Sequence, residues 1–248
     1  MGSRLSNSSL KIFKECQRCF WLVNSCLTCQ APRTPRVCTE KKGHKIWNRP
    51  YTIVAQVTNG IDERLRDHYN NFRTNNTLPT ELRGKPEFAN LKLFPDKSKM
   101  IDYGNATDYE VGLIYDDESL DSRLNGGLDE LFITKDDKCV VVDFKTSFGH
   151  KDLHERYKED IKFGYQTQLS IYAFLLQKLK HKTESYGLLL HYYPENIQEN
   201  GDFEFGVDIV KMPVNVKNAY NLWKDGATLL KSSCPPDNGD CDWCKGRP

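Results

Sequence analysis

The sequence has 248 residues, of which 28% are charged and 11% are aromatic, with a net charge of +1. A chain of this length and composition can bury a hydrophobic core, which excludes wholesale disorder and a miniature scaffold held only by disulfides. No apolar run approaches the roughly 18 residues of a membrane span. Charged residues also interrupt the N-terminal region, where a secretory signal would be apolar. We therefore expect a soluble, cytoplasmic protein.

The charge is unevenly distributed along the chain. Residues 1–50 contain ten Lys or Arg and two acids, a local charge of +8, and the remaining 25 basic and 32 acidic residues give −7. A basic end on an acidic body is typical of proteins that contact a polyanion. A solvated basic surface explains the same pattern equally well.

The N-terminal half predicts two helices separated by an irregular insert. The segment Ser6-Asn-Ser-Ser9 is typical of a helix start, and apolar side chains follow it at helical spacing. Residues 24–50 break the pattern and are rich in Pro, Lys, Arg and Cys, which predicts an insert or loop. Thr58 or Asn59 can cap the second helix. Residues 74–107 contain three prolines and predict loops.

The C-terminal half predicts strands and helices in alternation. A helix over 161–180 has the strongest apolar periodicity, and a short polar turn between two apolar runs predicts a hairpin. The predicted elements in order are strands at 109–116, 126–134 and 139–146, the helix 161–180, strands at 186–193 and 203–210, a helix at 214–232 and an irregular cysteine tail at 233–248.

Two acids and a lysine meet in the predicted hairpin. A three-residue loop at 135–137 would place Asp129 opposite Asp143, with Cβ atoms on the order of 5 Å apart. A four-residue loop would offset them by one position. Lys145 lies two residues after Asp143 and therefore shares its strand face.

This constellation favours metal chemistry. Two carboxylates so close together repel each other unless a positive charge lies between them, and Mg²⁺ or Mn²⁺ suits hard oxygen ligands. Such an ion can activate water and stabilise a phosphodiester transition state. Lys145 could position the water or stabilise charge at phosphorus, and its burial would let its pKa fall. The alternative is an ion pair on a solvated sheet face, but Asp143 ends an apolar run typical of a covered strand.

At these residues the sequence resembles the RecB-like branch of the PD-(D/E)XK nuclease superfamily, which includes AddB-type helicase–nucleases and CRISPR-adaptation nucleases. The three motifs of that branch occur here in order, as Gly127-Leu-Asp129, Asp143-Phe-Lys145-Thr-Ser147 and Gln168-Leu-Ser-Ile-Tyr172. The resemblance covers residues 6–22 and about 109–244. It implies one α/β domain over residues 1–248, with a restriction-endonuclease-like core, a mixed sheet of about five strands flanked by helices, and cysteine-rich ends.

The resemblance also implies the roles of the hairpin residues. Asp129 and Asp143, together with the carbonyl of Phe144, would bind Mg²⁺ or Mn²⁺. Lys145 would orient or activate the attacking water.

Two helices would complete this site. Gln168 and Tyr172 lie four residues apart on one helix face and would position the DNA strand. An earlier helix of the family contributes an acid or a histidine, for which Asp62 is the candidate, with Glu63 and His68 as alternatives. An acid in the first turn of a helix is also favourable simply through the helix dipole.

Nine cysteines gather mainly near the chain ends. Cys16, Cys19, Cys241 and Cys244 form two Cys-x-x-Cys pairs, which suit Zn²⁺ or an iron–sulfur centre. Alternatively, Cys16 joins Cys234, Cys241 and Cys244. Either set would tie the two ends together, and reduced thiols without a ligand are the third possibility.

The cysteine pattern departs from the family in two places. Several RecB-like nucleases begin with Ser-x-Leu-x-x-Phe-x-x-Cys-Pro and hold an iron–sulfur cluster with cysteines from both ends. Gln17 replaces that proline here, and no cysteine follows Cys244. The family cluster therefore does not carry over intact. The three cysteines of the insert, Cys26, Cys29 and Cys38, are expected to bind nothing.

The resemblance implies a metal-dependent DNA nuclease that hydrolyses phosphodiester bonds at DNA ends or in single strands, in DNA processing such as repair. Its partners would be DNA and a helicase or another DNA-processing protein, with no membrane. Two alternatives remain open: a nucleic-acid-binding module that no longer cleaves, and an interaction protein held together by zinc. A Walker-type phosphate loop and a Gly-x-Ser-x-Gly motif are both absent from the sequence, which disfavours those enzyme classes.

Overall fold

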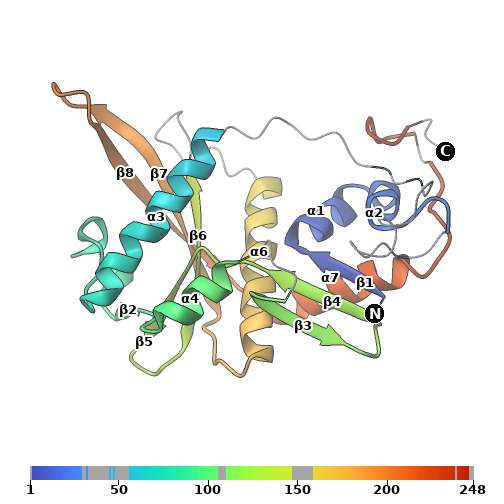
Figure 1. Cartoon of the computed structure of the whole chain (residues 1–248), viewed down its shortest axis with the longest axis horizontal. Coiled ribbons are helices and arrows are strands. Elements are labelled where there is room, and N and C mark those ends of the chain that lie inside the picture. Colours follow the sequence, from blue (N-terminus) through green and yellow to red (C-terminus); the bar gives the residue numbers. More distant parts are fainter. Residues whose placement is uncertain are drawn as a thin grey trace. The chain divides into compact units, whose positions relative to one another are not determined.

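The computed structural model describes residues 2–29, 32, 45, 47, 56–105, 110–146, 159–237 and 239–245 (Figure 1). Its contacts divide the chain into two compact units. The smaller unit comprises Met1–Ile53, Ile114–Asn125 and Lys217–Pro248, and the larger comprises Val54–Leu113 and Gly126–Val216. Most of the predicted insert at 24–50 lies outside the described residues, as does Ser147 of the second motif. That residues 1–248 act as one domain stays a prediction.

A five-stranded mixed sheet forms the centre of the larger unit, in the order β2-β5-β6-β7-β8 (Figure 1). Its strands are β2 (Leu91–Leu93), β5 (Glu130–Thr134), β6 (Cys139–Thr146), β7 (Tyr186–Ile197) and β8 (Phe203–Pro213). The neighbours β6 and β7 run parallel, whereas β2 with β5, β5 with β6, and β7 with β8 run antiparallel. This confirms the expected α/β class with a mixed sheet of five strands.

Two helices cover the faces of this sheet at β6. They are α3 (Gln56–Thr74) and α6 (Glu159–Lys178). Side chains alternate between the faces of a strand. Val140, Val142 and Phe144 accordingly pack in one apolar cluster with Tyr69 of α3. Asp143, on the opposite face, meets α6 instead. Both faces of β6 are therefore covered, as its apolar run predicts.

The β5–β6 hairpin has the predicted register. Glu130 pairs with Val142 and Leu131 with Val141, which is the register that a three-residue loop gives. The Thr134 amide donates to the Lys138 carbonyl at 2.9 Å and closes the loop. Asp137 within the loop has a φ of +56°, the left-handed conformation that such loops use.

Predictions for the region before the hairpin were partly wrong. Helix α3 begins at Gln56, so Thr58 and Asn59 lie inside it and cannot be its N-cap. Residues 74–107 contain β2 and α4 (Lys97–Gly104), besides the short 3-10 turns η1 (Thr80–Leu82) and η2 (Pro86–Phe88). These elements are too short to show an apolar period. The signal that was present is Asp96, whose carboxylate caps α4 by accepting from the Lys99 amide at 3.0 Å.

The smaller unit contains a second sheet that was not predicted. Its order is β1-β4-β3, with β1 and β4 parallel. The strands are β1 (Ser3–Ser6), β3 (Leu113–Asp117) and β4 (Ser122–Gly126), and the accompanying helices are α1 (Asn7–Glu15), α2 (Gln17–Asn24) and α7 (Val216–Leu229). The strand expected at 126–134 is shorter than predicted and begins at Glu130 as β5, whereas β4 was not predicted. Within the described part of the chain, no helix combines the length and apolar composition that crossing a membrane requires.

The first predicted helix is interrupted at Cys16. Ser6 caps α1 as predicted, because its hydroxyl accepts from the Ser9 amide at 3.4 Å. Cys16 has an extended backbone, with φ −161° and ψ 111°. Its sulfur accepts from the Cys19 amide at 3.3 Å and thereby caps α2. The break starts a new helix between the two cysteines of the first Cys-x-x-Cys pair.

A buried ion pair links α3 to β5 and should be important for stability. Arg73 Nη2 donates to both oxygens of Glu130, at 2.7 and 2.6 Å, and Nη1 donates to the Phe94 carbonyl. Both paired side chains are 2% exposed. Burial raises the pKa of Glu130, and Arg73 opposes this rise. Arg73→Met would leave the carboxyl group buried without its partner, and we expect it to lower the free energy of unfolding by about 3–5 kcal/mol.

Urea denaturation of Arg73→Met against Arg64→Met measures this effect. Arg64 lies on the same helix with its side chain 85% exposed, so its replacement should change stability by less than about 0.5 kcal/mol. Equal effects of the two substitutions would show that the buried pair contributes no more than a surface charge.

Candidate active site

The two acids and the lysine of the hairpin lie together, as the register predicts. The Phe144 amide donates to Asp129 Oδ2 at 2.9 Å, which fixes the Asp129 carboxylate against β6. Lys145 Nζ forms an ion pair with Asp143 and also donates to the Phe144 carbonyl at 3.1 Å. Asp143 is 1% exposed. A buried carboxylate, a second carboxylate and an ammonium therefore share the end of one hairpin.

The site is electrostatically strained by its two carboxylates. Burial raises the pKa of Asp143, Lys145 opposes the rise, and Asp129 adds to it by repulsion. A buried acid whose charge is opposed by a neighbouring acid is typical of functional sites. A divalent cation would relieve this repulsion.

The expectation that the pKa of Lys145 falls was wrong. Burial does disfavour its charge, but Asp143 and Asp129 lie close enough to raise its pKa above the ordinary value. The ring of Tyr165 adds a cation–π contact, with Nζ 5.0 Å from the ring centroid. Lys145 therefore keeps its proton at neutral pH. A charged ammonium group can stabilise negative charge that develops on a phosphate.

Helix α6 brings Gln168 and Tyr172 to the same place. Gln168 Nε2 donates to Asp143 Oδ1 at 2.8 Å and to the Tyr172 hydroxyl at 3.0 Å. The two side chains thus lie on one helix face, as their spacing predicts. Gln168 orients the Asp143 carboxylate, which is a contact that the motif alone did not predict. A contact of either residue with DNA stays a prediction.

The structure places Asp62 of α3 at this site rather than either alternative. Burial and the charge of Asp129 raise the pKa of Asp62, whereas Lys145, Arg66 and a hydrogen bond with Thr146 oppose the rise. Its Oδ1 atom is buried and has no hydrogen-bond partner. An unpartnered buried carboxylate oxygen is what a cation ligand would present.

The two alternatives to Asp62 are engaged elsewhere or exposed. His68 Nε2 contacts the Glu81 carboxylate at 3.1 Å. Glu63 is exposed to solvent. Asp62 is thus the acid on α3 whose position and chemistry fit the hairpin site.

Sequence reasoning missed two residues of the site. Arg66 Nη2 donates to Asp129 Oδ1 at 2.7 Å, and Nη1 donates to the Gly104 carbonyl at 3.1 Å. Tyr165 lies over Lys145, as described above. Helix spacing could have indicated both residues. Arg66 follows Asp62 by four residues and Tyr165 precedes Gln168 by three, so each shares a helix face with a predicted site residue.

The donor set fits a hard divalent cation. Asp62, Asp129 and Asp143 supply carboxylate oxygens, and the Phe144 carbonyl lies beside Lys145. Mg²⁺ and Mn²⁺ prefer such oxygen ligands. The unpartnered Oδ1 of Asp62 and the mutual repulsion of the other two acids both favour binding of a cation at this place.

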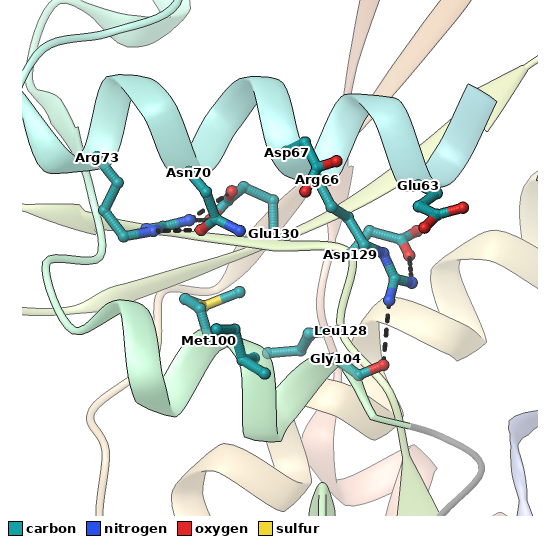
Figure 2. Close-up of a pocket in the computed structure, with 11 residues that line it drawn as sticks. Glu63, Arg66, Asp67, Asn70, Arg73, Met100, Gly104, Leu128, Asp129 and Glu130 are labelled. Carbon is teal, nitrogen blue, oxygen red and sulfur yellow. Dashed lines mark hydrogen bonds and ion pairs between the residues drawn. The ribbon is translucent and has the colours of Figure 1, made fainter. Parts of the chain in front are cut away.

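A pocket of about 210 Å³ opens between α3 and α4 beside Asp129 (Figure 2). Figure 2 shows Arg66 reaching from α3 to Asp129 and to the Gly104 carbonyl at one end, and Arg73 with Glu130 at the other. The pocket is lined by Glu63, Arg66, Asp67, Asn70, Arg73, Met100, Ile101, Gly104, Leu128, Asp129 and Glu130.

Four cysteines form a separate cluster in the smaller unit. Cys16 Sγ lies 3.6 Å from Cys244 Sγ, and Cys19 Sγ lies 3.4 Å from Cys241 Sγ. All four sulfurs lie within 4.8 Å of one another. Cys234 is outside this group, and its sulfur accepts from Arg18 Nη1 at 3.6 Å. The structure therefore groups the first of the two predicted sets and not the alternative that includes Cys234.

The local backbone favours a thiolate in this cluster. Burial opposes ionisation of Cys241, but hydrogen bonds from the backbone of Cys244 and Trp243 lower its pKa to about 7. Thiolates are the metal-binding form of cysteine. Burial raises the pKa of Cys19 and Cys244, so a metal ion at these four close sulfurs would have to displace their protons.

Comparisons with known proteins agree with the motifs. The family model of the PD-(D/E)XK nuclease superfamily, PDDEXK_1, matches residues 58–248. No curated protein matches the chain. A solved structure titled "Crystal structure of SSO0001" is 20% identical to this chain, with a TM-score of 0.28 over 49% of this chain and 48% of that one. The match thus spans about half of that solved chain.

Proposed function

Because the chain belongs to the PD-(D/E)XK nuclease superfamily, we propose that it is a Mg²⁺- or Mn²⁺-dependent deoxyribonuclease that hydrolyses phosphodiester bonds at DNA ends or in single strands. The observation that carries this proposal is the meeting of three carboxylates from α3, β5 and β6 beside an ammonium group. The gathering of Asp62, Asp129 and Asp143 around Lys145 has the charge and the ligand chemistry that phosphodiester hydrolysis needs.

The residues of the chain have distinct roles in this proposal. Asp62, Asp129, Asp143 and the Phe144 carbonyl hold the cation, which supplies Lewis-acid stabilisation and a more acidic water when bound. Lys145 stabilises the negative charge that develops on the phosphate oxygens. The hydrogen bonds of Gln168 to Asp143 and of Arg66 to Asp129 hold those carboxylates in place.

We propose, in addition, that the chain belongs to the RecB-like branch and works with a helicase or another DNA-processing protein. The support is the Gln168 and Tyr172 pair, which reaches Asp143 from α6. A binding module that no longer cleaves is the second candidate. The presence of Lys145 and all three acids favours the nuclease.

For the cysteine cluster we propose a single Zn²⁺ ion. Sulfurs bound to one zinc at about 2.3 Å lie about 3.8 Å apart in a tetrahedron. Two sulfur pairs here lie 3.4 and 3.6 Å apart, and all four sulfurs are within 4.8 Å of one another. In a four-iron cluster each cysteine binds a different iron, which spreads the sulfurs further apart. The compact grouping favours one zinc ion.

Cleavage of end-labelled single- and double-stranded DNA tests the proposed nuclease. With Mg²⁺ or Mn²⁺, the protein should cut DNA, and EDTA should stop it. Asp143→Asn removes a buried charge from the cation site and should lower the rate by about 10²–10⁴-fold. The matched control is Asp136→Asn, in the exposed loop of the same hairpin, which should cut normally. Folded protein that binds DNA but cuts none under any metal condition would support the binding module instead.

A further inference from the structure

The pocket between α3 and α4 shares Asp129 with the proposed cation site (Figure 2). A group that fills this pocket therefore lies next to the bond that the site would cleave. Its volume of about 210 Å³ is below the roughly 300–1,000 Å³ of sites for drug-sized ligands. The pocket is suited to a single small fragment of a larger substrate.

The charges around the pocket exclude a phosphate group. Four acids and two arginines line it, which gives a net charge of −2 from four negative and two positive groups. Both arginines already pair with carboxylates, Arg66 with Asp129 and Arg73 with Glu130. No lining cation is therefore left over for an anion, and the surplus of negative charge keeps a phosphate group out of the pocket.

The remaining lining groups suit a flat, partly apolar ligand. Met100, which is 6% exposed, supplies apolar surface at the floor, and Ile101 lies at the exposed edge. Asn70 adds one directed polar group. Arg73 Nε donates to Asn70 Oδ1 at 3.2 Å, so the amide orientation is set, and Nδ2 is the donor that it can offer to a ligand. Every nucleobase carries ring-nitrogen or carbonyl acceptors at its edge that such a donor can meet.

We propose that this pocket receives the base and sugar of the nucleotide that adjoins the scissile phosphate, with Asn70 donating to the base edge and Met100 packing against the ring. The inference rests on the proposed nuclease function and adds a substrate subsite to it. The phosphate itself would remain on the side of Lys145, where the positive charge lies. The base and sugar of one nucleotide would thus lie in the pocket and its phosphate beside Lys145, with Asp129 between the two places.

Methionine-methyl NMR tests the subsite without relying on cleavage. The chain has three methionines, of which Met100 lines the pocket and Met212 is fully buried on β8, so Met212 is an internal control. The full-length Lys145→Ala variant, labelled at the methionine methyl groups, would be titrated with Mg²⁺ and a short single-stranded oligonucleotide. The same oligonucleotide with abasic sugars and free deoxyadenosine are the comparison probes. Met100→Leu assigns the signal.

The expected result is a shift of the Met100 methyl signal with the normal oligonucleotide and with deoxyadenosine, but not with the abasic strand, while Met212 stays still. Asn70→Ala should weaken binding of the normal strand about tenfold, the value of one hydrogen bond, and leave abasic binding unchanged. Asn71→Ala, an exposed neighbour on α3, should change neither.

The outcomes separate the subsite from the nuclease. Oligonucleotide binding without any movement of Met100 would overturn the subsite even where the wild-type protein cuts DNA. If the Met100 signal responds to deoxyadenosine but the wild-type protein cuts no DNA, the subsite is supported and the proposed nuclease function is wrong. No Met100 response to any probe would reject the subsite.

Discussion

Lys145→Ala should lower the rate of DNA cleavage by about 10³-fold while the fold and the affinity for DNA stay close to those of the wild type. The ammonium group is the positive charge held directly against Asp143, and its pKa is raised, so it carries a full charge at neutral pH. Removing one preorganised charge-stabilising group typically costs about 10²–10³ in rate. Lys145 would also help to position the attacking water, so we expect a loss of rate at the upper end of this range.

Single-turnover cleavage at saturating DNA measures this loss, and fluorescence anisotropy in Ca²⁺ measures DNA affinity separately. Raising the Mg²⁺ concentration should not restore the rate, because the proposed role of Lys145 is to act on the phosphate and not to bind the cation. Lys135→Ala, in the exposed hairpin loop, is the control for loss of a positive charge. Cleavage by Lys145→Ala at the wild-type rate would mean that the catalytic assignment is wrong.

Much of the site was predictable because short-range geometry determines it. The length of the loop after Thr134 sets the hairpin register, and the register alone places Asp129 beside Asp143. The i, i+4 spacing likewise places Gln168 and Tyr172 on one face of a helix whose apolar period is strong. In both cases the information lies within about 15 residues of sequence.

The missed contacts depend on how separate elements pack. Arg66 meets Asp129 only because α3 lies across β5, and no local pattern carries that crossing. The pKa of Lys145 depends on a balance between burial and two carboxylates, and the sequence suggested burial but not which effect is larger. Strand β4, Ser122–Gly126, was missed because it is short and mostly polar, so it has no strand-like alternation.

The choice of cysteines for the cluster likewise depended on contacts that the sequence pattern does not determine. Their spacing predicted two pairs but left Cys19 and Cys234 as equal choices for the cluster. The choice was made by the break at Cys16, which caps α2 through the Cys19 amide and so brings both thiols to one side. Cys234 instead lies against Arg18, a contact between residues that are far apart in sequence.

Loss of the proposed zinc ion from the cysteine cluster should destabilise the smaller unit strongly. Structural zinc sites contribute apparent binding energies of about 10–16 kcal/mol in small domains, and their ligands lose order without the ion. Here the cluster joins α2 to the cysteine tail, segments more than 200 residues apart in sequence. We expect Cys241→Ser to lower the melting temperature by at least about 10 °C, since 1 kcal/mol corresponds to about 2–4 °C at this chain length.

Cys234→Ser is the matched control, because Cys234 lies in the same tail but outside the group of four sulfurs. It should melt within about 2 °C of the wild type. Elemental analysis should find one zinc per chain in the wild type and in Cys234→Ser, and none in Cys241→Ser. If the protein is instead brown, contains iron and absorbs visible light, the zinc assignment is wrong and the same cysteines bind an iron–sulfur centre. Equal melting of both variants, with no bound metal, would show that the four thiols are unligated and that packing alone joins the two segments.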